Sequence, residues 1–244
     1  MLISIIIATY NAEKTLQRCL DSIIPQLSDQ VELIIIDGGS IDKTSEIVKS
    51  NSQYITYYLS EKDDGIYDAW NKGINKANGT WLLFVGSDDT LMGNAIEQYK
   101  SYIKDNPDCD FISAKVNYLN ENKQIIAITG NKWDYNRCKI NMDVTHVASI
   151  TNINYFKRVG LFNTKYKIVG DYELLMRGGH NMKAGFLNKI VANMAIGGLS
   201  FSVKGLKEQM RVKREVAKIS AFMCYMIFLY QLVAFYTYKL RHRA

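Results

Sequence analysis

Residues 81–90 (Trp-Leu-Leu-Phe-Val-Gly-Ser-Asp-Asp-Thr) constrain the fold of this 244-residue chain more than any other segment. An uninterrupted apolar run between two glycines, Gly79 and Gly86, is typical of a strand buried inside a parallel sheet. The run leads directly to Asp88 and Asp89. Paired carboxylates at a strand end suit a divalent cation such as Mg²⁺ or Mn²⁺, which prefers carboxylate oxygens and shares them with substrate phosphates. Alone, the pair is equally compatible with the N-cap and first turn of a following helix.

Apolar runs and helical periodicity alternate along the first half of the chain. This alternation predicts an α/β fold with a mostly parallel sheet, right-handed crossovers and flanking helices. The predicted strands cover residues 2–8, 31–36, 55–59, 81–85 and 110–116, and the predicted helices cover residues 16–24, 64–74 and 95–104 and include 47–48. Residues 118 and 125–128 can form a β-hairpin across the polar turn at 120–122.

Three polar clusters follow predicted strands at the point where each strand ends. They are Thr9-Tyr10-Asn11, residues 37–42 and Ser87-Asp88-Asp89. The carboxyl ends of parallel strands share one edge of the sheet, and ligands bind outside that edge. Three independent clusters at one edge favour a ligand site over a purely structural role for the two aspartates.

The segments that cradle phosphates in many nucleotide-binding proteins are missing from the sequence. There is no GxGxxG after the first strand and no GxxxxGK[ST] anywhere, which argues against dinucleotide-binding and P-loop proteins. A phosphorylated ligand would then depend on a metal held by the acidic strand end.

The composition fits one folded α/β domain with a small appendage, since 48% of residues are hydrophobic and 22% are charged. Basic residues concentrate toward the C-terminus without any nucleic-acid-binding motif, so a membrane surface suits this charge better than nucleic acid. The four cysteines have no CxxC spacing, which favours a reducing compartment over a zinc site or a disulfide framework. The apolar N-terminus lacks a basic start and is too short for a signal peptide.

A second group of candidate residues lies in the C-terminal half. Asp171 follows Gly170 as a helix-starting residue with Glu173 in the first turn, and a general base needs the fixed aim that a helix start provides. His146 is compatible with either a structural or a functional role.

Four ordered motifs, IIATYN at 6–11, IDGGSIDKT at 36–44, GIYDAWNKG at 65–73 and GSDD at 86–89, resemble those of family 2 glycosyltransferases of the GT-A fold. The chain looks most like bacterial members that build O-antigen and other exopolysaccharides. The resemblance covers about residues 1–200, and His146 with residues 170–173 resembles the acceptor-side half of that subgroup.

The resemblance implies a role for each matching position. Nucleotide-sugar contacts are implied for Thr9, Tyr10, Asn11, Asp37, Gly39, Ser40, Asp42, Asp68, Asn71, Lys72 and Asp88. Asp89, with Asp88, would hold the divalent cation, Asp171 would be the catalytic base, and His146 and Glu173 would lie on the acceptor or pyrophosphate side. Ser87 departs from the first aspartate of the family's DxD-type motif, which places more of the metal binding on Asp89.

The implied activity is inverting transfer of one sugar from a nucleotide diphosphate sugar, with a UDP-sugar as the expected donor. The expected acceptor is a lipid-linked oligosaccharide on polyprenyl diphosphate in bacterial surface-polysaccharide synthesis. No QxxRW segment of processive synthases follows Asp171. Two alternatives are a non-catalytic sugar-nucleotide-binding subunit and a nucleotidyltransferase, although residues 8–11 lack the glycine- and arginine-rich loop of the latter.

The predicted organisation is a GT-A catalytic domain over 1–203 followed by a helical tail over 204–244, basic and then apolar. The domain would divide into a nucleotide-sugar half, 1–116, and an acceptor half, 117–203. Residues 219–238 carry no charge, which leaves three alternatives: a helix on the membrane surface, a helix that spans the membrane, and a helix packed on the domain or in a homo-oligomer. The expected location is cytoplasmic, peripheral or monotopic on the inner face of the cytoplasmic membrane.

Overall fold

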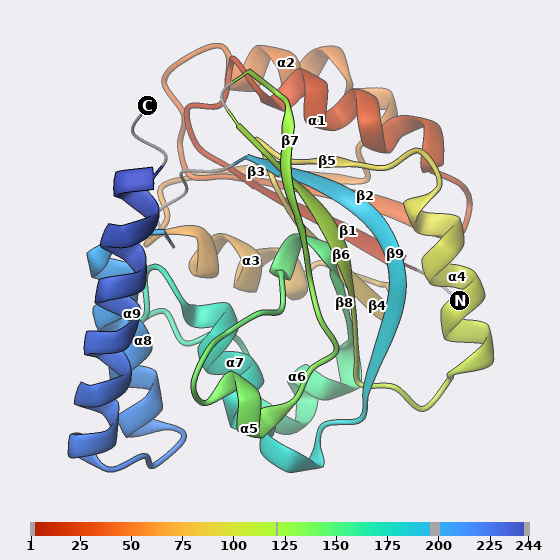
Figure 1. The fold of residues 1–244 in the computed structure, drawn as a ribbon. Coiled ribbons are helices and arrows are strands. Elements are labelled where there is room, and N and C mark those ends of the chain that lie inside the picture. The colour runs from red at the N-terminus through yellow and green to blue at the C-terminus, as the bar shows by residue number, and fades with distance from the viewer. Residues whose placement is uncertain (1–2, 121, 196–200, 242–244) are drawn as a thin grey trace.

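The computed structural model describes residues 3–120, 122–195 and 201–241. Four parallel strands form one half of the central sheet, in the order β3-β2-β1-β4 (Figure 1). They are β1 (Ile3–Thr9), β2 (Val31–Asp37), β3 (Tyr57–Ser60) and β4 (Trp81–Gly86). Every residue of β1 and β2 is buried, including Ser4 and Glu32 within their apolar runs, as is typical of strands covered on both faces. The predicted parallel core is confirmed.

The other half of the sheet is mixed. It contains β8 (Ser149–Asn152), β6 (Phe111–Leu119), β9 (Ala184–Ala195) and β5 (Thr90–Leu91), with β7 (Ile125–Thr129) paired to β6 as the predicted hairpin. β8 runs antiparallel to β4 and β6, whereas β9 runs parallel to β6 and antiparallel to β5. β5 follows β4 almost directly in the chain but closes the far end of the strand order. The sheet therefore curls so that β9 and β5 return to the acidic turn after β4.

Helices cover both faces of the sheet and create two hydrophobic cores. Alternate residues of β1 face opposite sides, so Ile5 and Ile7 join one core and Ile6 joins the other. The first core includes residues of α1 (Leu16–Ile23), α2 (Thr44–Ser50) and α4 (Ala95–Asp105). The second includes residues of α3 (Ile66–Ile74), α5 (Tyr135–Cys138), α6 (Ile153–Val159) and α7 (Gly170–Gly178).

The C-terminal tail is helical and packs on the second core. Helix α8 (Val203–Glu215) contacts α7, and α9 (Ala221–Arg241) lies along α8 on the outside of the molecule (Figure 1). Buried Lys213 joins these parts, because its Nζ donates to Ile140 O at 2.9 Å and to Gln231 Oε1 at 3.2 Å. Burial lowers the pKa of Lys213 to about 8. Within the described ranges, no helix combines the length and apolarity needed to cross a bilayer.

Candidate active site

The first two predicted clusters meet at the carboxyl edge of the sheet. Thr9 and Asp37 are partners in the β1–β2 register, and Gly38 N donates to Thr9 O at 2.9 Å. Asn11 adopts a left-handed conformation with φ of 48°, and its backbone N–H donates to Ser40 Oγ at 2.8 Å. Its side-chain Oδ1 accepts from Ile41 N at 3.0 Å. These bonds hold the two loops together as one surface.

Asp37 is fully buried and anchors that surface. Its carboxylate accepts from Ser40 N at 3.1 Å, from Ser40 Oγ at 2.5 Å and from Ser60 Oγ at 2.5 Å. A carboxylate has about four lone-pair sites, so three donors leave room for about one more. Because Asp37 is fully buried, its predicted contact with a base stays a prediction.

The other residues of these two loops with predicted donor contacts are either exposed or constrained by the backbone. Tyr10 is 63% exposed, which leaves its ring available for a ligand. Gly39 has φ of +82°, and a Cβ there would lie 3.4 Å from Lys62 N, so glycine suits this turn. Asp42 accepts from Thr44 N at 3.0 Å and from Glu13 N at 3.1 Å, which ties it to the loop.

The acidic pair at the end of β4 surrounds Gly86. A Cβ on Gly86 would lie 2.9 Å from both Asp88 Oδ1 and Asp89 Oδ2, so the two carboxylates approach the same point. Asp89 is buried, whereas Asp88 is exposed. Burial and the charge of Asp88 raise the pKa of Asp89 well above its usual range, against the opposing effect of backbone bonds from Gly86 and Ala195.

This pair has the chemistry of an incomplete cation site. Two neighbouring carboxylates, one of them buried, are stabilised by a nearby positive charge. Among the described residues, no group of three or more His, Cys, Asp or Glu side chains could hold a metal ion by itself. The pair therefore fits a hard divalent cation whose other ligands come from a diphosphate and water, as Mg²⁺ sites often do.

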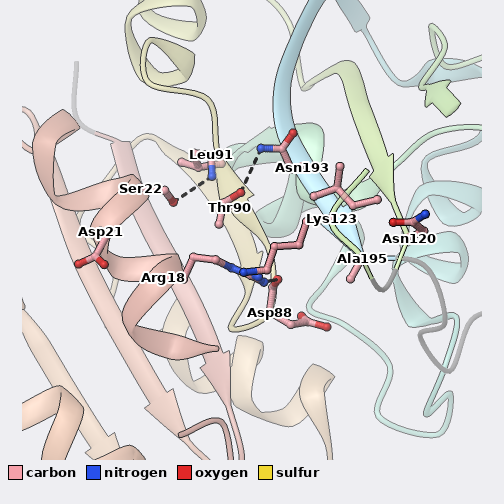
Figure 2. Close-up of a pocket in the computed structure, with 11 residues that line it drawn as sticks. Arg18, Asp21, Ser22, Asp88, Thr90, Leu91, Asn120, Lys123, Asn193 and Ala195 are labelled. Atoms are coloured by element: carbon pink, nitrogen blue, oxygen red, sulfur yellow. Dashed lines mark hydrogen bonds between the residues drawn. The ribbon is translucent and has the colours of Figure 1, made fainter. Parts of the chain in front are cut away.

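A cavity of about 580 Å³ opens beside Asp88, between α1, β5, β9 and the β6–β7 turn (Figure 2). Arg18 extends from α1 to donate to Asp88 O at 2.8 Å. The residues that line the cavity are Arg18, Asp21, Ser22, Asp88, Thr90, Leu91, Leu119, Asn120, Lys123, Asn193 and Ala195. Asp88 is the predicted site residue among them. The others have no local sequence signal, because distant segments meet here.

Asp171 is held at the start of α7 by a residue of α3. Tyr67 donates to Asp171 Oδ1 at 3.0 Å, and the same hydroxyl lies 2.9 Å from Ile168 O. A Cβ on Gly170 would lie 2.9 Å from the Tyr67 ring, so glycine allows this close packing. Burial and the charge of Asp171 raise the pKa of Tyr67 well above its usual range, which keeps the phenol protonated as a donor.

Glu208 of α8 fixes the backbone just before this helix. Its carboxylate accepts from the amides of Lys167 at 2.9 Å, Ile168 at 2.8 Å and Val169 at 3.1 Å. The Asp171 segment is thus held by α3 on one side and by the tail on the other. Sequence patterns miss Glu208, because a pairing across about 40 residues leaves no periodic signal.

His146 lies in an aromatic cluster next to this segment. Its ring centroid is 4.7 Å from that of Trp70 and 5.3 Å from that of Phe84. Both ring nitrogens are buried and lack a hydrogen-bond partner among the described residues. Burial lowers the pKa of His146, and the charge of Asp171 opposes this shift. An unpartnered buried imidazole has the capacity to bind a ligand group, so its predicted acceptor-side role stays a prediction.

Glu173 has a structural partner. It is buried and paired with Arg177 at 2.9 Å, and Arg177 also donates to the carbonyls of Val159 and Leu161. This pairing joins α7 to the end of α6. The acceptor-side contact predicted for Glu173 stays a prediction, with its carboxylate already engaged.

The predicted residues on α3 are also engaged with the protein. Asn71 exchanges two hydrogen bonds with the backbone of Phe162, at 2.9 and 3.0 Å. Lys72 pairs with Glu61 at 2.8 Å and with Asp68 at 3.3 Å. These contacts tie α3 to its neighbours, and direct donor contacts of Asp68, Asn71 and Lys72 stay predictions.

The comparison with known families agrees with this arrangement. Residues 4–168 match the model of glycosyl transferase family 2. The chain belongs to this family. It is a glycosyltransferase, as predicted, and the nucleotidyltransferase alternative is set aside.

Curated relatives of this family 2 glycosyltransferase include enzymes of glycoconjugate synthesis. A PGL/p-HBAD biosynthesis glycosyltransferase of Mycobacterium tuberculosis is 30% identical over 207 residues, covering 82% of this chain and 79% of the relative. A dolichyl N-acetyl-α-D-glucosaminyl phosphate 3-β-D-2,3-diacetamido-2,3-dideoxy-β-D-glucuronosyltransferase of Methanococcus voltae is 34% identical over 131 residues, or 49% of this chain and 40% of the relative.

Solved structures confirm the predicted GT-A fold. Staphylococcus aureus TarS 1–349, in complex with UDP-GlcNAc, superposes with a TM-score of 0.69 at 17% identity, covering 93% of this chain and 70% of that one. The mannosyltransferase PcManGT of Pyrobaculum calidifontis, in complex with GDP-Man and Mn²⁺, gives 0.67 at 14% identity, covering 89% and 64%.

Proposed function

We propose that this glycosyltransferase moves one sugar, with inversion, from a UDP-sugar to a polyprenyl-diphosphate-linked saccharide in bacterial surface-polysaccharide synthesis. The observation that carries the proposal is that three groups of residues, each suited to one step of sugar transfer, lie toward one edge of the sheet. The loops that follow β1 and β2 would contact the nucleotide. Asp88 and Asp89 form an acidic pair after β4, and Asp171 lies at the start of α7, where Tyr67 holds it. Tyr67 lies in the first turn of α3, the helix that follows β3, and its hydrogen bond to Asp171 supports a position of the proposed base near this edge.

Each group has a task that follows from its chemistry. Departure of a nucleotide diphosphate leaves negative charge on the β-phosphate. A divalent cation on Asp89 and Asp88 would supply the neutralising charge when bound. Asp171 would accept the proton of the acceptor hydroxyl as that oxygen attacks the anomeric carbon from the face opposite the diphosphate. One displacement inverts the configuration. Tyr67 orients Asp171 through its 3.0 Å hydrogen bond.

Similar proteins support the donor, the cation and the acceptor. TarS binds UDP-GlcNAc, and PcManGT binds GDP-Man with Mn²⁺. The M. voltae relative is named for a dolichyl phosphate-linked sugar, a lipid-linked acceptor. A lipid-linked acceptor also suits the proposed location on the inner face of the cytoplasmic membrane.

A donor screen tests the proposal. Thermal unfolding is measured with UDP-, GDP- and dTDP-sugars, with and without Mn²⁺, because a ligand of the native state raises its apparent stability. Transfer to a synthetic polyprenyl-diphosphate saccharide is then followed with the stabilising donor. We expect Asp171→Asn to bind the donor and to lose turnover. An active Asp171→Asn enzyme would refute the base assignment.

The same experiment distinguishes this enzyme from a non-catalytic sugar-nucleotide-binding subunit. That protein would show Mn²⁺-dependent stabilisation by a donor and no transfer to any acceptor in the wild-type chain. Product with inverted anomeric configuration, determined by NMR, supports the enzyme.

A further inference from the structure

Helix α9 presents a wide apolar surface that no described element covers. Phe222, Tyr230 and Val233 are 74%, 69% and 67% exposed. The exposed large apolar side chains of this helix are Phe222, Met223, Tyr225, Met226, Leu229, Tyr230, Val233 and Tyr236, here called the α9 face. Exposed apolar patches of this kind usually mark an interaction site.

The opposite side of α9 is occupied by the protein itself. Cys224, Ile227 and Phe235 are buried, and Gln231 bonds with Lys213 of α8. At 100° per residue, the buried positions and the α9 face lie on opposite halves of the helix. No charged residue occurs between Lys218 and Lys239. The α9 face is therefore one continuous uncharged strip along a helix anchored from behind.

Helix α8, on which α9 packs, carries a row of exposed cations. Lys204, Lys207, Arg211 and Arg214 are exposed, and their spacing of three and four residues places them on one side of the helix. Arg211 pairs with Glu215, whereas no ion pair of the described residues involves the other three. The turn between the two helices adds exposed Lys218.

We propose that α8 and α9 lie on an anionic lipid bilayer, with the α9 face in the interfacial region and the α8 cations on the headgroups. An interfacial helix combines a large apolar face with basic residues, and tyrosines favour the boundary between lipid and water. A second copy of the chain is the competing occupant. A two-fold interface through the α9 face would give the exposed cations of α8 no anionic partner, whereas an anionic bilayer supplies one. The proposal extends beyond sugar transfer and does not depend on the identity of the donor.

Vesicle flotation of the full chain tests the proposal. We expect the chain to float with phosphatidylglycerol-containing vesicles and to bind phosphatidylcholine vesicles about tenfold or more weakly. Raising the salt from about 0.1 M to about 1 M shortens the Debye length from about 10 Å to about 3 Å and should remove most of the anionic preference.

Two sets of variants separate the apolar and electrostatic contributions. Phe222→Ser/Leu229→Ser/Val233→Ser should weaken binding to anionic vesicles about tenfold or more. Its matched control, Ile125→Ser/Ile126→Ser/Ile128→Ser, removes exposed apolar side chains from β7 and should bind as the wild type does. Lys204→Gln/Lys207→Gln/Arg214→Gln should lose the preference for anionic vesicles, whereas Lys49→Gln/Lys104→Gln/Lys157→Gln, at exposed positions elsewhere, should retain it.

Each contrary outcome overturns the proposal. Failure of the wild-type chain to float with anionic vesicles, or equal flotation of the α9-face variant, would rule out the membrane surface. A dimer in light scattering that the α9-face variant dissociates, without vesicle binding, would assign the face to a second copy. Transfer to a soluble, short-chain acceptor should be unchanged in these variants, so failure of the membrane proposal and failure of the transferase proposal are distinguishable.

Discussion

Tyr67 Oη lies 3.0 Å from Asp171 Oδ1 and joins the first turn of α3 to the first turn of α7. Helix α3 follows the nucleotide-side strands, and α7 carries the proposed base. The hydroxyl also lies 2.9 Å from Ile168 O, so it couples the carboxylate to the backbone that Glu208 holds from α8. Three elements far apart in the chain thus determine where Asp171 points.

Loss of that hydroxyl should slow the chemical step. We expect Tyr67→Phe to lower kcat about tenfold, because a hydrogen bond to a charged group contributes about 1.5–3 kcal/mol and the variant leaves Asp171 less well oriented. Donor affinity should be unchanged. Steady-state kinetics with isothermal titration of the donor measures both. An unchanged kcat would show that the bond serves folding alone.

Removal of either carboxylate of the acidic pair should remove metal-dependent transfer. Asp89→Ala and Asp88→Ala are expected to reduce turnover by about 100-fold or more, since the cation stabilises developing diphosphate charge by several kcal/mol. Chelation should inactivate the wild type, and Mn²⁺ or Mg²⁺ should restore it. Isothermal titration of Mn²⁺ in the presence of UDP should show the loss directly. Full activity of a chelator-treated enzyme would contradict the prediction.

Glu208 should act on catalysis through the position of Asp171. Glu208→Ala removes the acceptor of three amides, and Glu208→Gln keeps one carbonyl oxygen, so kcat should fall about tenfold in the former and less in the latter. The KM for the donor should be unchanged in both Glu208 variants. Glu215→Gln is the matched control on the same helix, because Glu215 bonds to Tyr166 and Arg211 instead. Equal losses in kcat and donor affinity would indicate general destabilisation.

Gly86 should be required for the geometry of the acidic pair. A methyl group there would approach Asp88 Oδ1 and Asp89 Oδ2 at 2.9 Å, closer than van der Waals contact allows. We expect Gly86→Ala to weaken Mn²⁺ binding in the presence of UDP and to destabilise the fold by about 1–3 kcal/mol. Gly93→Ala, whose Cβ would meet no atom within 4 Å, is the control and should change neither quantity.

His146 should make stability depend on pH. Burial lowers its folded-state pKa, so the unfolded chain binds the proton more readily. This contribution to stability is complete above the unfolded pKa of about 6.5 and is lost as the pH falls toward the folded pKa. The urea midpoint should therefore fall between about pH 7 and pH 5, and His146→Gln should flatten that slope. His180→Gln, at an exposed position, is the control.

The local pattern of apolar residues was sufficient to predict the strands of the parallel half of the sheet. The apolar runs at 2–8, 31–36, 55–59 and 81–85 predict β1 to β4, because short apolar runs that end in polar turns are typical of strands in a parallel sheet. The same reasoning does not predict β8 or β9. β8 spans four residues, and β9 pairs with β6 through two register shifts, which break the alternation of buried and exposed side chains.

Part of the candidate site can likewise be predicted from the sequence, and part of it cannot. Polar residues directly after strands are visible in the sequence, and the structure brings Thr9, Asn11 and Asp37 into one surface. The cavity beside Asp88, with Arg18 and Asn193, is not visible, because its walls come from α1, β9 and the hairpin turn. Contacts of this range depend on how the sheet curls.

The sequence by itself determined the family, the parallel core and the carboxylates available for chemistry, since each depends on neighbours within a few positions. Only the tertiary structure decided which of these carboxylates are buried. Asp37 and Glu173 are buried with protein partners, whereas Asp88 is exposed and Asp171 is partly exposed. The physical reason is that the pairing and burial of a charge are set by side chains from distant segments, which packing alone brings together.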